Sequence, residues 1–145
     1  FIHSDSHTDA VALPYRKTYE LDMQTLENHC VNPDAIFLVA ETDEGEIAGF
    51  ITASMSWNKF IAVDYIAVER TKRRAGAAQK LMAAAHVWAR SVNAAGLRLE
   101  TQNVNVSACL FYRHYGFTLG GYDRFLYNAL PEKDEIALFW YYMLI

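Results

Sequence analysis

The sequence predicts an α+β protein of one domain, residues 1–145, built on a mixed but mostly antiparallel sheet. Three observations lead to this class. Short apolar runs rich in β-branched and aromatic residues are separated by turn residues, as in antiparallel strands. One central stretch instead has its apolar positions at helical spacing. A further apolar run follows that stretch, so a strand, a helix and a strand form a crossover that joins parallel strands.

The first three strands are expected at Ala35–Glu41, Ile47–Met55 and 60–69. The residues between the first two strands, 42–46, have turn chemistry, which predicts an antiparallel hairpin. A short link that includes Trp57, Asn58 and Lys59 leads to the third strand and completes a meander. Before the strands, apolar positions in 13–29 fit one face of a helix or of two short helices.

A helix is expected at 71–94, where one apolar stripe is formed by Ala77, Leu81, Ala84, Ala85, Trp88 and Val92. Gly96 ends this helix, and the strand 97–101 should then run parallel to the third strand. A second, shorter helix at 107–115 ends at Gly116.

Composition narrows the classes of partner and compartment. The formal net charge of -4 argues against a nucleic-acid surface, which would carry a broad basic face. Cys30 and Cys109 form no paired framework, so free thiols and a reducing, cytoplasmic location are expected. The longest apolar run, 138–145, falls far short of the roughly 20 residues of a membrane helix. Phe1 is not an initiator Met and begins no signal peptide, so the N-terminus is expected to be incomplete.

No metal site is expected. His3 and His7 are spaced by four, with Asp5 and Asp9 nearby, but two histidines supply only half of a tetrahedral site. No Cys or third His lies close to them, so a solvated segment is the preferred interpretation.

A basic run at the start of the long helix indicates an anionic ligand. Arg70, Lys72, Arg73 and Arg74 gather where a helix N-terminus carries positive partial charge and should repel them. Free N–H groups and the glycine at position 76 make a phosphate cradle, and two arginines suit a diphosphate better than one carboxylate. Taken alone, the run could also be solvated or paired to nearby acids.

A second run, 105–117, has the pattern N-x-x-A-x-x-F-Y-x-x-x-G-F. It places Asn105, then Ala108 or Cys109, then Tyr112 on successive turns of the shorter helix. In this order and spacing the two runs resemble the GNAT family of N-acetyltransferases, over about residues 35–130.

The resemblance implies a sheet splayed at its centre with flanking helices, and acetyl-coenzyme A (acetyl-CoA) as co-substrate. The first run would bind its pyrophosphate, and the backbone of the third strand would engage its pantetheine and polarise the acetyl carbonyl. The implied cofactor-binding residues are Ile66, Ala67, Val68, Arg73, Arg74, Ala75, Gly76, Ala77, Ala78, Asn105, Ala108 and Tyr112.

Longer strings at 14–19, 99–103, 116–123 and 135–141 resemble the streptothricin acetyltransferases. This implies acetylation of a primary amine on the β-lysine arm of a cationic antibiotic, and hence resistance. Two alternatives remain open: the same reaction on a polyamine, another amine metabolite or a protein amine, and a non-catalytic acyl-CoA-binding sensor.

Amide formation requires a neutral amine, and an amine with a pKa near 10 arrives protonated. Asp64 is the first candidate for the base, because alternation in twos places it on one face with Ile66 and Val68, where partial desolvation would raise its pKa. Similar proteins have Glu here, so a bridging water or an electrostatic role is also open. Glu100 on the next strand is the second candidate. Both carboxylates would attract a polycation without any proton transfer.

The resemblance implies Tyr112 as the general acid toward the coenzyme thiolate; the alternative is a core tyrosine with a satisfied hydroxyl. Cys109 is not expected to act as a nucleophile, because His114 is five residues away and off its face. Direct attack within a ternary complex is therefore expected.

Aromatic residues and acids are concentrated in two expected terminal strands, roughly 117–127 and 135–144. Aromatic faces beside carboxylates suit a cationic ligand. Candidate acceptor-binding residues are Trp57, Asp64, Glu100, Asp123 and Trp140. For most of the aromatic residues the preferred interpretation is core or a homodimer interface.

Overall fold

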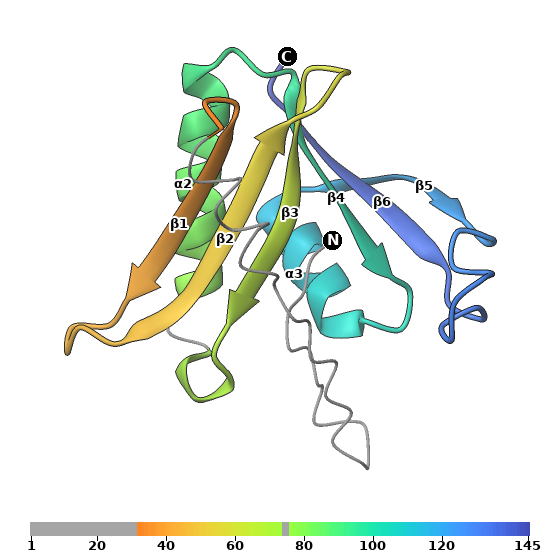
Figure 1. Cartoon of the computed structure of the whole chain (residues 1–145), viewed down its shortest axis with the longest axis horizontal. Helices are drawn as coiled ribbons and strands as arrows, with labels where there is room; N and C mark the ends of the chain where they lie inside the picture. Colours follow the sequence, from red (N-terminus) through yellow and green to blue (C-terminus); the bar gives the residue numbers. More distant parts are fainter. Residues whose placement is uncertain (1–31, 74–75) are drawn as a thin grey trace.

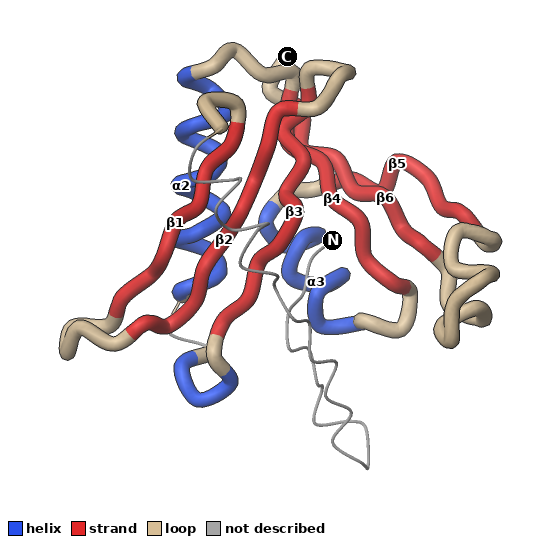
Figure 2. Tube along the Cα trace, viewed as in Figure 1, coloured by secondary structure: helices blue, strands red, loops and turns tan. Residues whose placement is uncertain are grey.

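The computed structural model describes residues 32–73 and 76–145, which form one six-stranded sheet with two α-helices (Figures 1 and 2). Along the sheet the strands are ordered β1-β2-β3-β4-β6-β5. The elements are β1 (Ala35–Glu41), β2 (Ile47–Met55), β3 (Phe60–Val68), the 3-10 turn η1 (Arg70–Lys72), α2 (Ala77–Ser91), β4 (Gly96–Gln102), α3 (Val106–Tyr115), β5 (Thr118–Asp123) and β6 (Ala137–Met143). The predicted α+β class with a mostly antiparallel sheet is confirmed.

The sheet is splayed at its centre, between β3 and β4. These two strands are parallel and pair only at their first three residues, Phe60–Ala62 with Gly96–Arg98, whereas every other neighbouring pair is antiparallel. Beyond Ala62 and Arg98 the strands diverge, and Figure 1 shows α3 beside the widening gap. The second half of β3 therefore has a main-chain edge that β4 does not use.

A β-bulge interrupts β3 at Asp64. Thr52 of β2 pairs with Tyr65 while the next residue, Ala53, pairs with Val63, so Asp64 has no residue opposite it. The buried positions of β3 are Ile61 and Val63 before the bulge but Ile66 and Val68 after it. The alternation argument that placed Asp64 on one face with Ile66 and Val68 is therefore wrong, because the bulge shifts the phase by one residue.

The long helix begins later than the pattern predicts, at Ala77 rather than Thr71. Arg70 and Lys72 belong to the turn η1, where Lys72 bridges Glu69 at 2.7 Å and Glu46 of the first hairpin at 2.8 Å. Gly76 then adopts φ +80°, the left-handed region that favours glycine. The charge crowding at the helix start is thus relieved partly by nearby acids.

The core lies between the sheet and the helices. Leu81, Met82 and Ala85 of α2 pack with Ile51 and Ile61 of the sheet, and Figure 1 shows α2 lying along one face of β1 and β2. At the other end of the core, the rings of His86, Tyr115, Phe117 and Tyr142 contact one another and join both helices to β6.

The strand predicted at 117–127 stops at Asp123, because Asp123 Oδ1 accepts a hydrogen bond from Phe125 N at 2.8 Å and turns the chain. Successive turns then lead to β6. None of the helices in the described part of the chain is long and apolar enough to span a membrane. The expected helix at 13–29 and the pair His3 and His7 lie outside the described residues.

Candidate functional site

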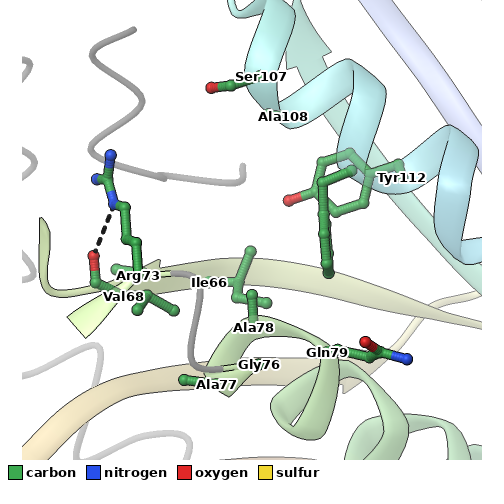
Figure 3. Close-up of a pocket in the computed structure, with 12 residues that line it drawn as sticks. Ile66, Val68, Arg73, Gly76, Ala77, Ala78, Gln79, Ser107, Ala108 and Tyr112 are labelled. Atoms are coloured by element: carbon green, nitrogen blue, oxygen red, sulfur yellow. Dashed lines mark hydrogen bonds between the residues drawn. The ribbon is translucent and has the colours of Figure 1, made fainter. Parts of the chain in front are cut away.

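A cavity of about 470 Å³ opens where the sheet is splayed. Three structural elements and the loop before α2 enclose it (Figure 3). Its lining residues are Ile66, Ala67, Val68, Arg73, Gly76, Ala77, Ala78, Gln79, Ser107, Ala108, Phe111 and Tyr112. The two sequence runs that were predicted to form one site therefore meet in one cavity.

One wall of the cavity is the free half of β3. Ile66, Ala67 and Val68 lie beyond the last residue that pairs with β4, so their β4-side main-chain groups have no partner in that strand. Arg73 Nε donates to Val68 O at 3.4 Å, which fixes the basic loop against the end of this wall. A ligand lying along β3 could hydrogen-bond to it as an added strand would.

The start of α2 forms the end of the cavity. Within the described part of the chain no side chain caps this helix, which leaves its first N–H groups for an anion. Ala77, Ala78 and Gln79 follow Gly76, and a Cβ built on Gly76 would meet no atom within 4 Å. Together with Arg73 this end suits phosphate groups. Arg74 and Ala75 lie outside the described residues.

The opposite wall is one face of α3, where Ser107, Ala108, Phe111 and Tyr112 recur at helical spacing. Asn105 does not line the cavity. Its side-chain Oδ1 accepts from Ala108 N at 3.2 Å and caps the helix, so it helps to orient this wall. Its direct contact with a coenzyme stays a prediction.

Tyr112 is 1% exposed, and Figure 3 shows its hydroxyl oxygen turned toward the space between α3 and β3. Burial raises the pKa of Tyr112 well above its ordinary value of 10.0. The phenol is therefore protonated at neutral pH and can donate a proton to a group in the cavity.

Cys109 points away from this chemistry. Its Sγ lies 3.4 Å from Thr101 Oγ1 and donates weakly to Gln102 O at 3.9 Å. Burial raises the pKa of the thiol above its ordinary value. A protonated thiol held by β4 is a poor nucleophile, in keeping with the expectation of direct attack.

Two carboxylates stand at the mouth of the splay. Asp64 comes two residues after Ala62 on β3, and Glu100 comes two residues after Arg98 on β4. Ser54 Oγ donates to Asp64 Oδ2 at 2.8 Å, and Tyr127 Oη donates to Glu100 Oε2 at 2.6 Å. Neither carboxylate lines the cavity. The residue before each carboxylate, Val63 or Leu99, is buried and points into the core. The two carboxylates therefore lie on the opposite face of the sheet from the buried core.

The other candidate acceptor residues have different surroundings. Trp57 is 91% exposed in the turn between β2 and β3. Trp140 is buried in the core, where its Nε1 donates to Thr101 Oγ1 at 3.0 Å. Asp123 shapes the end of β5, as described above.

The structure adds residues that the sequence patterns did not single out. Gln79, Ser107 and Phe111 line the cavity, and Tyr127 contacts Glu100. Ser107 and Phe111 could have been found from their helical spacing to Ala108 and Tyr112. Tyr127 carries no such signal, because it is 27 residues from its partner.

Comparisons with known proteins agree with this geometry. Residues 5–117 match the Acetyltransferase (GNAT) family. A streptothricin acetyltransferase of Escherichia coli is 39% identical over 130 residues, which is 89% of this chain and 71% of that protein. Streptothricin acetyltransferase A of Bacillus subtilis is 37% identical over 129 residues, covering 89% of this chain and 73% of that protein.

A solved structure from Bacillus anthracis in complex with acetyl coenzyme A superposes with a TM-score of 0.82. It is 36% identical, and the match covers 90% of this chain and 75% of that one. The chain thus belongs to the GNAT acetyltransferase family, and the resemblance seen in its sequence is confirmed.

Proposed function

We propose that this protein transfers the acetyl group of acetyl-CoA to a primary amine of a small cationic acceptor, most directly the β-lysine arm of streptothricin. The proposal rests on how four features of the structure are arranged around the splay. The uncapped start of α2, the free edge of β3 and the Tyr112 phenol face a single cavity, and two carboxylates stand at the same splay.

The cavity residues fit the donor. N–H groups at the start of α2 and the Arg73 guanidinium would hold the diphosphate. The free edge of β3 at Ile66 to Val68 would bind the pantetheine amides and polarise the acetyl carbonyl. Arg74 and Ala75 belong to the same sequence run and are assigned the same diphosphate role.

Tyr112 is proposed as the general acid. When the amine displaces coenzyme A from the acetyl carbon, the sulfur leaves as a thiolate and needs a proton. The buried phenol is protonated and faces the cavity, so it can supply that proton. The attack is direct, because Cys109 is held away by Thr101 and Gln102.

Asp64 and Glu100 are proposed for the acceptor side. Asp64, at the bulge, would accept the ammonium proton through a bridging water, because its side chain is short and is also held by Ser54. Glu100 would attract and hold the cation. Trp57 and Asp123 stay predictions as acceptor contacts, whereas the indole of Trp140 is committed to the core.

Streptothricin is preferred because two relatives that bear that name are 37% and 39% identical over 89% of this chain. The paired carboxylates would equally suit a polyamine, which makes polyamine acetylation the second candidate. A sensor without catalysis would need neither the Tyr112 phenol nor the acidic pair.

The test is release of free thiol from acetyl-CoA in the presence of streptothricin, spermidine, free lysine or a lysine peptide. Turnover with streptothricin at least tenfold more efficient than with the others supports the proposal. Brisk turnover of spermidine or the peptide without streptothricin turnover would replace the acceptor. Acetyl-CoA binding without turnover of any amine would contradict catalysis altogether.

A further inference from the structure

Tyr127 is a buried residue in a connection whose other residues are exposed or half-buried. The connection 124–136 between β5 and β6 is a succession of turns. Throughout this stretch, which the structure describes completely, Tyr127 at 3% exposure is the only buried residue. A buried phenol is costly unless its hydroxyl finds a partner. The position of Tyr127 is therefore set by what its hydroxyl contacts.

That contact is the carboxylate of Glu100. Tyr127 Oη donates to Glu100 Oε2 at 2.6 Å, the short distance of a charge-assisted hydrogen bond. The side chain of Gln102 lies beside the Tyr127 hydroxyl. Burial, followed by the bond to Glu100, raises the pKa of Tyr127 far above its ordinary value. The phenol is thus a permanent donor, and within residues 32–73 and 76–145 no other side chain bonds to the Glu100 carboxylate.

Glu100, Gln102 and Tyr127 lie on the side of the sheet proposed for the acceptor. Glu100 and Gln102 alternate with Thr101, whose hydroxyl contacts Trp140 and Cys109 on the α3 side. Tyr127 therefore covers the face of β4 opposite α3, just beyond the last pairing with β3. Gln102 is 5% exposed, and its Oε1 has no hydrogen-bond partner among the described residues.

We propose that Tyr127 is a positioning residue for the acceptor: it holds Glu100 by one carboxylate oxygen and leaves the other to receive an ammonium group. This rests on the proposed function and assigns its cation-binding step to Glu100, Tyr127 and Gln102. A carboxylate already fixed in one rotamer loses less conformational entropy when it binds a cation. No proton transfer through Glu100 is required.

The experiment compares Tyr127→Phe with Tyr122→Phe, which removes a phenol hydroxyl from a 65% exposed position on neighbouring β5. Both are measured with streptothricin and acetyl-CoA by thiol release, and their thermal unfolding is recorded. Tyr127→Phe is expected to raise the KM for the acceptor about five- to tenfold, because one hydrogen bond to a charged group is lost. The kcat, the KM for acetyl-CoA and all constants of Tyr122→Phe should stay within about twofold.

A double-mutant cycle then tests whether Tyr127 acts through Glu100. Adding Tyr127→Phe to Glu100→Gln should raise the acceptor KM no further than Glu100→Gln alone, because the carboxylate is already absent. Additive increases, or an unchanged acceptor KM in Tyr127→Phe, would overturn the inference. A similar rise in both KM values and a fall in kcat, together with a lowered Tm, would also overturn it, because the role of Tyr127 would then be structural.

Gln102→Leu provides a second variant should Tyr127→Phe not fold. It removes a buried oxygen that has no partner among the described residues, which is tolerated or stabilising, and it takes away the amide that lies beside the Tyr127 hydroxyl. A raised acceptor KM supports the inference, and an unchanged one contradicts it. If the unsubstituted protein acetylates no amine, the proposed function fails. Calorimetric titration with streptothricin then tests the inference separately. Weaker binding to the variants than to the unsubstituted protein supports it, and equal binding contradicts it.

Discussion

The donor and acceptor sides of the splayed sheet are built in different ways. The described residues that line the donor cavity come from two short parts of the chain, 66–68 with 73 and 76–79 in one and 107–112 in the other, where neighbours share one helix face or one strand edge. The acceptor side instead depends on pairs distant in sequence, Ser54 with Asp64 and Tyr127 with Glu100. Local geometry can thus determine how the donor is held, while tertiary contacts would determine where the carboxylates proposed for the acceptor lie. Substitutions should separate the two sides.

The largest effect is expected from Tyr112→Phe on the donor side. Loss of the proposed general acid should lower kcat by about 10²-fold or more, with little change in either KM. Thiol release under saturating substrates measures this. The matched control is Tyr115→Phe on the same helix, which removes a hydroxyl that bonds to His86 Nδ1 at 3.3 Å and does not line the cavity. Comparable losses in both variants would mean that Tyr112 supports packing instead of proton transfer.

Asp64→Asn should show the next largest effect and a distinct pH dependence. At pH 7 kcat should fall about tenfold or more, because the acceptor ammonium then loses its proton without help. Since an amine with a pKa near 10 is increasingly neutral as pH rises, the deficit should shrink toward pH 10. Steady-state rates from pH 6.5 to 10 check this. Glu100→Gln is the comparison variant, and it should raise the acceptor KM at every pH. If the fall in kcat of Asp64→Asn does not vary with pH, both acids would be assigned to acceptor binding.

The difference between the two sides also explains how far the sequence could predict the site. The strands Ala35–Glu41 and Ile47–Met55 follow from alternation and turn residues. The cavity residues Ile66 to Val68 and Gly76 to Ala78 were instead predicted from the resemblance to the GNAT family. The bulge at Asp64 could not be predicted in this way, because the extra residue in β3 arises from how β3 pairs with β2. Alternation alone then assigns the wrong face.

Two other residues show the same limit. Trp140 was predicted at the acceptor side from its aromatic and acidic neighbours, yet its indole bonds to Thr101 in the core, since β6 lies beside β4 in the sheet. Tyr127 was placed in an expected strand, but the chain turns at Asp123 and returns over β4. Both outcomes depend on the order of strands in the sheet, which local patterns do not contain.

A smaller effect is expected from Gly76→Ala, measured against Gly45→Ala. The two glycines have φ of +80° and +82°, and a Cβ on either would meet no atom within 4 Å. Both substitutions should therefore cost a similar roughly 1 to 2 kcal/mol of unfolding free energy from backbone strain. Only Gly76→Ala should also raise the KM for acetyl-CoA, by several-fold, with the acceptor KM unchanged. Equal kinetics in the two variants would show that residue 76 matters for stability alone.

The smallest effect concerns the ring contacts that join α2, α3 and β6. Burial first, and the nearby charge of Arg90 second, lower the pKa of His86 below its ordinary 6.5. A lowered pKa means that the unfolded chain binds the proton better, so the contribution of neutral His86 is complete above pH 6.5 and is lost as pH falls through the folded-state value. His86→Phe keeps a ring against Tyr142, whose centroid lies 4.7 Å away, and removes the titration. Urea unfolding at pH 5 and pH 8 should give a smaller pH difference for this variant than for the unsubstituted protein. An identical difference would mean that acid lowers the free energy of unfolding through groups other than His86. The contacts between the helices and β6 would then not depend on the protonation of His86.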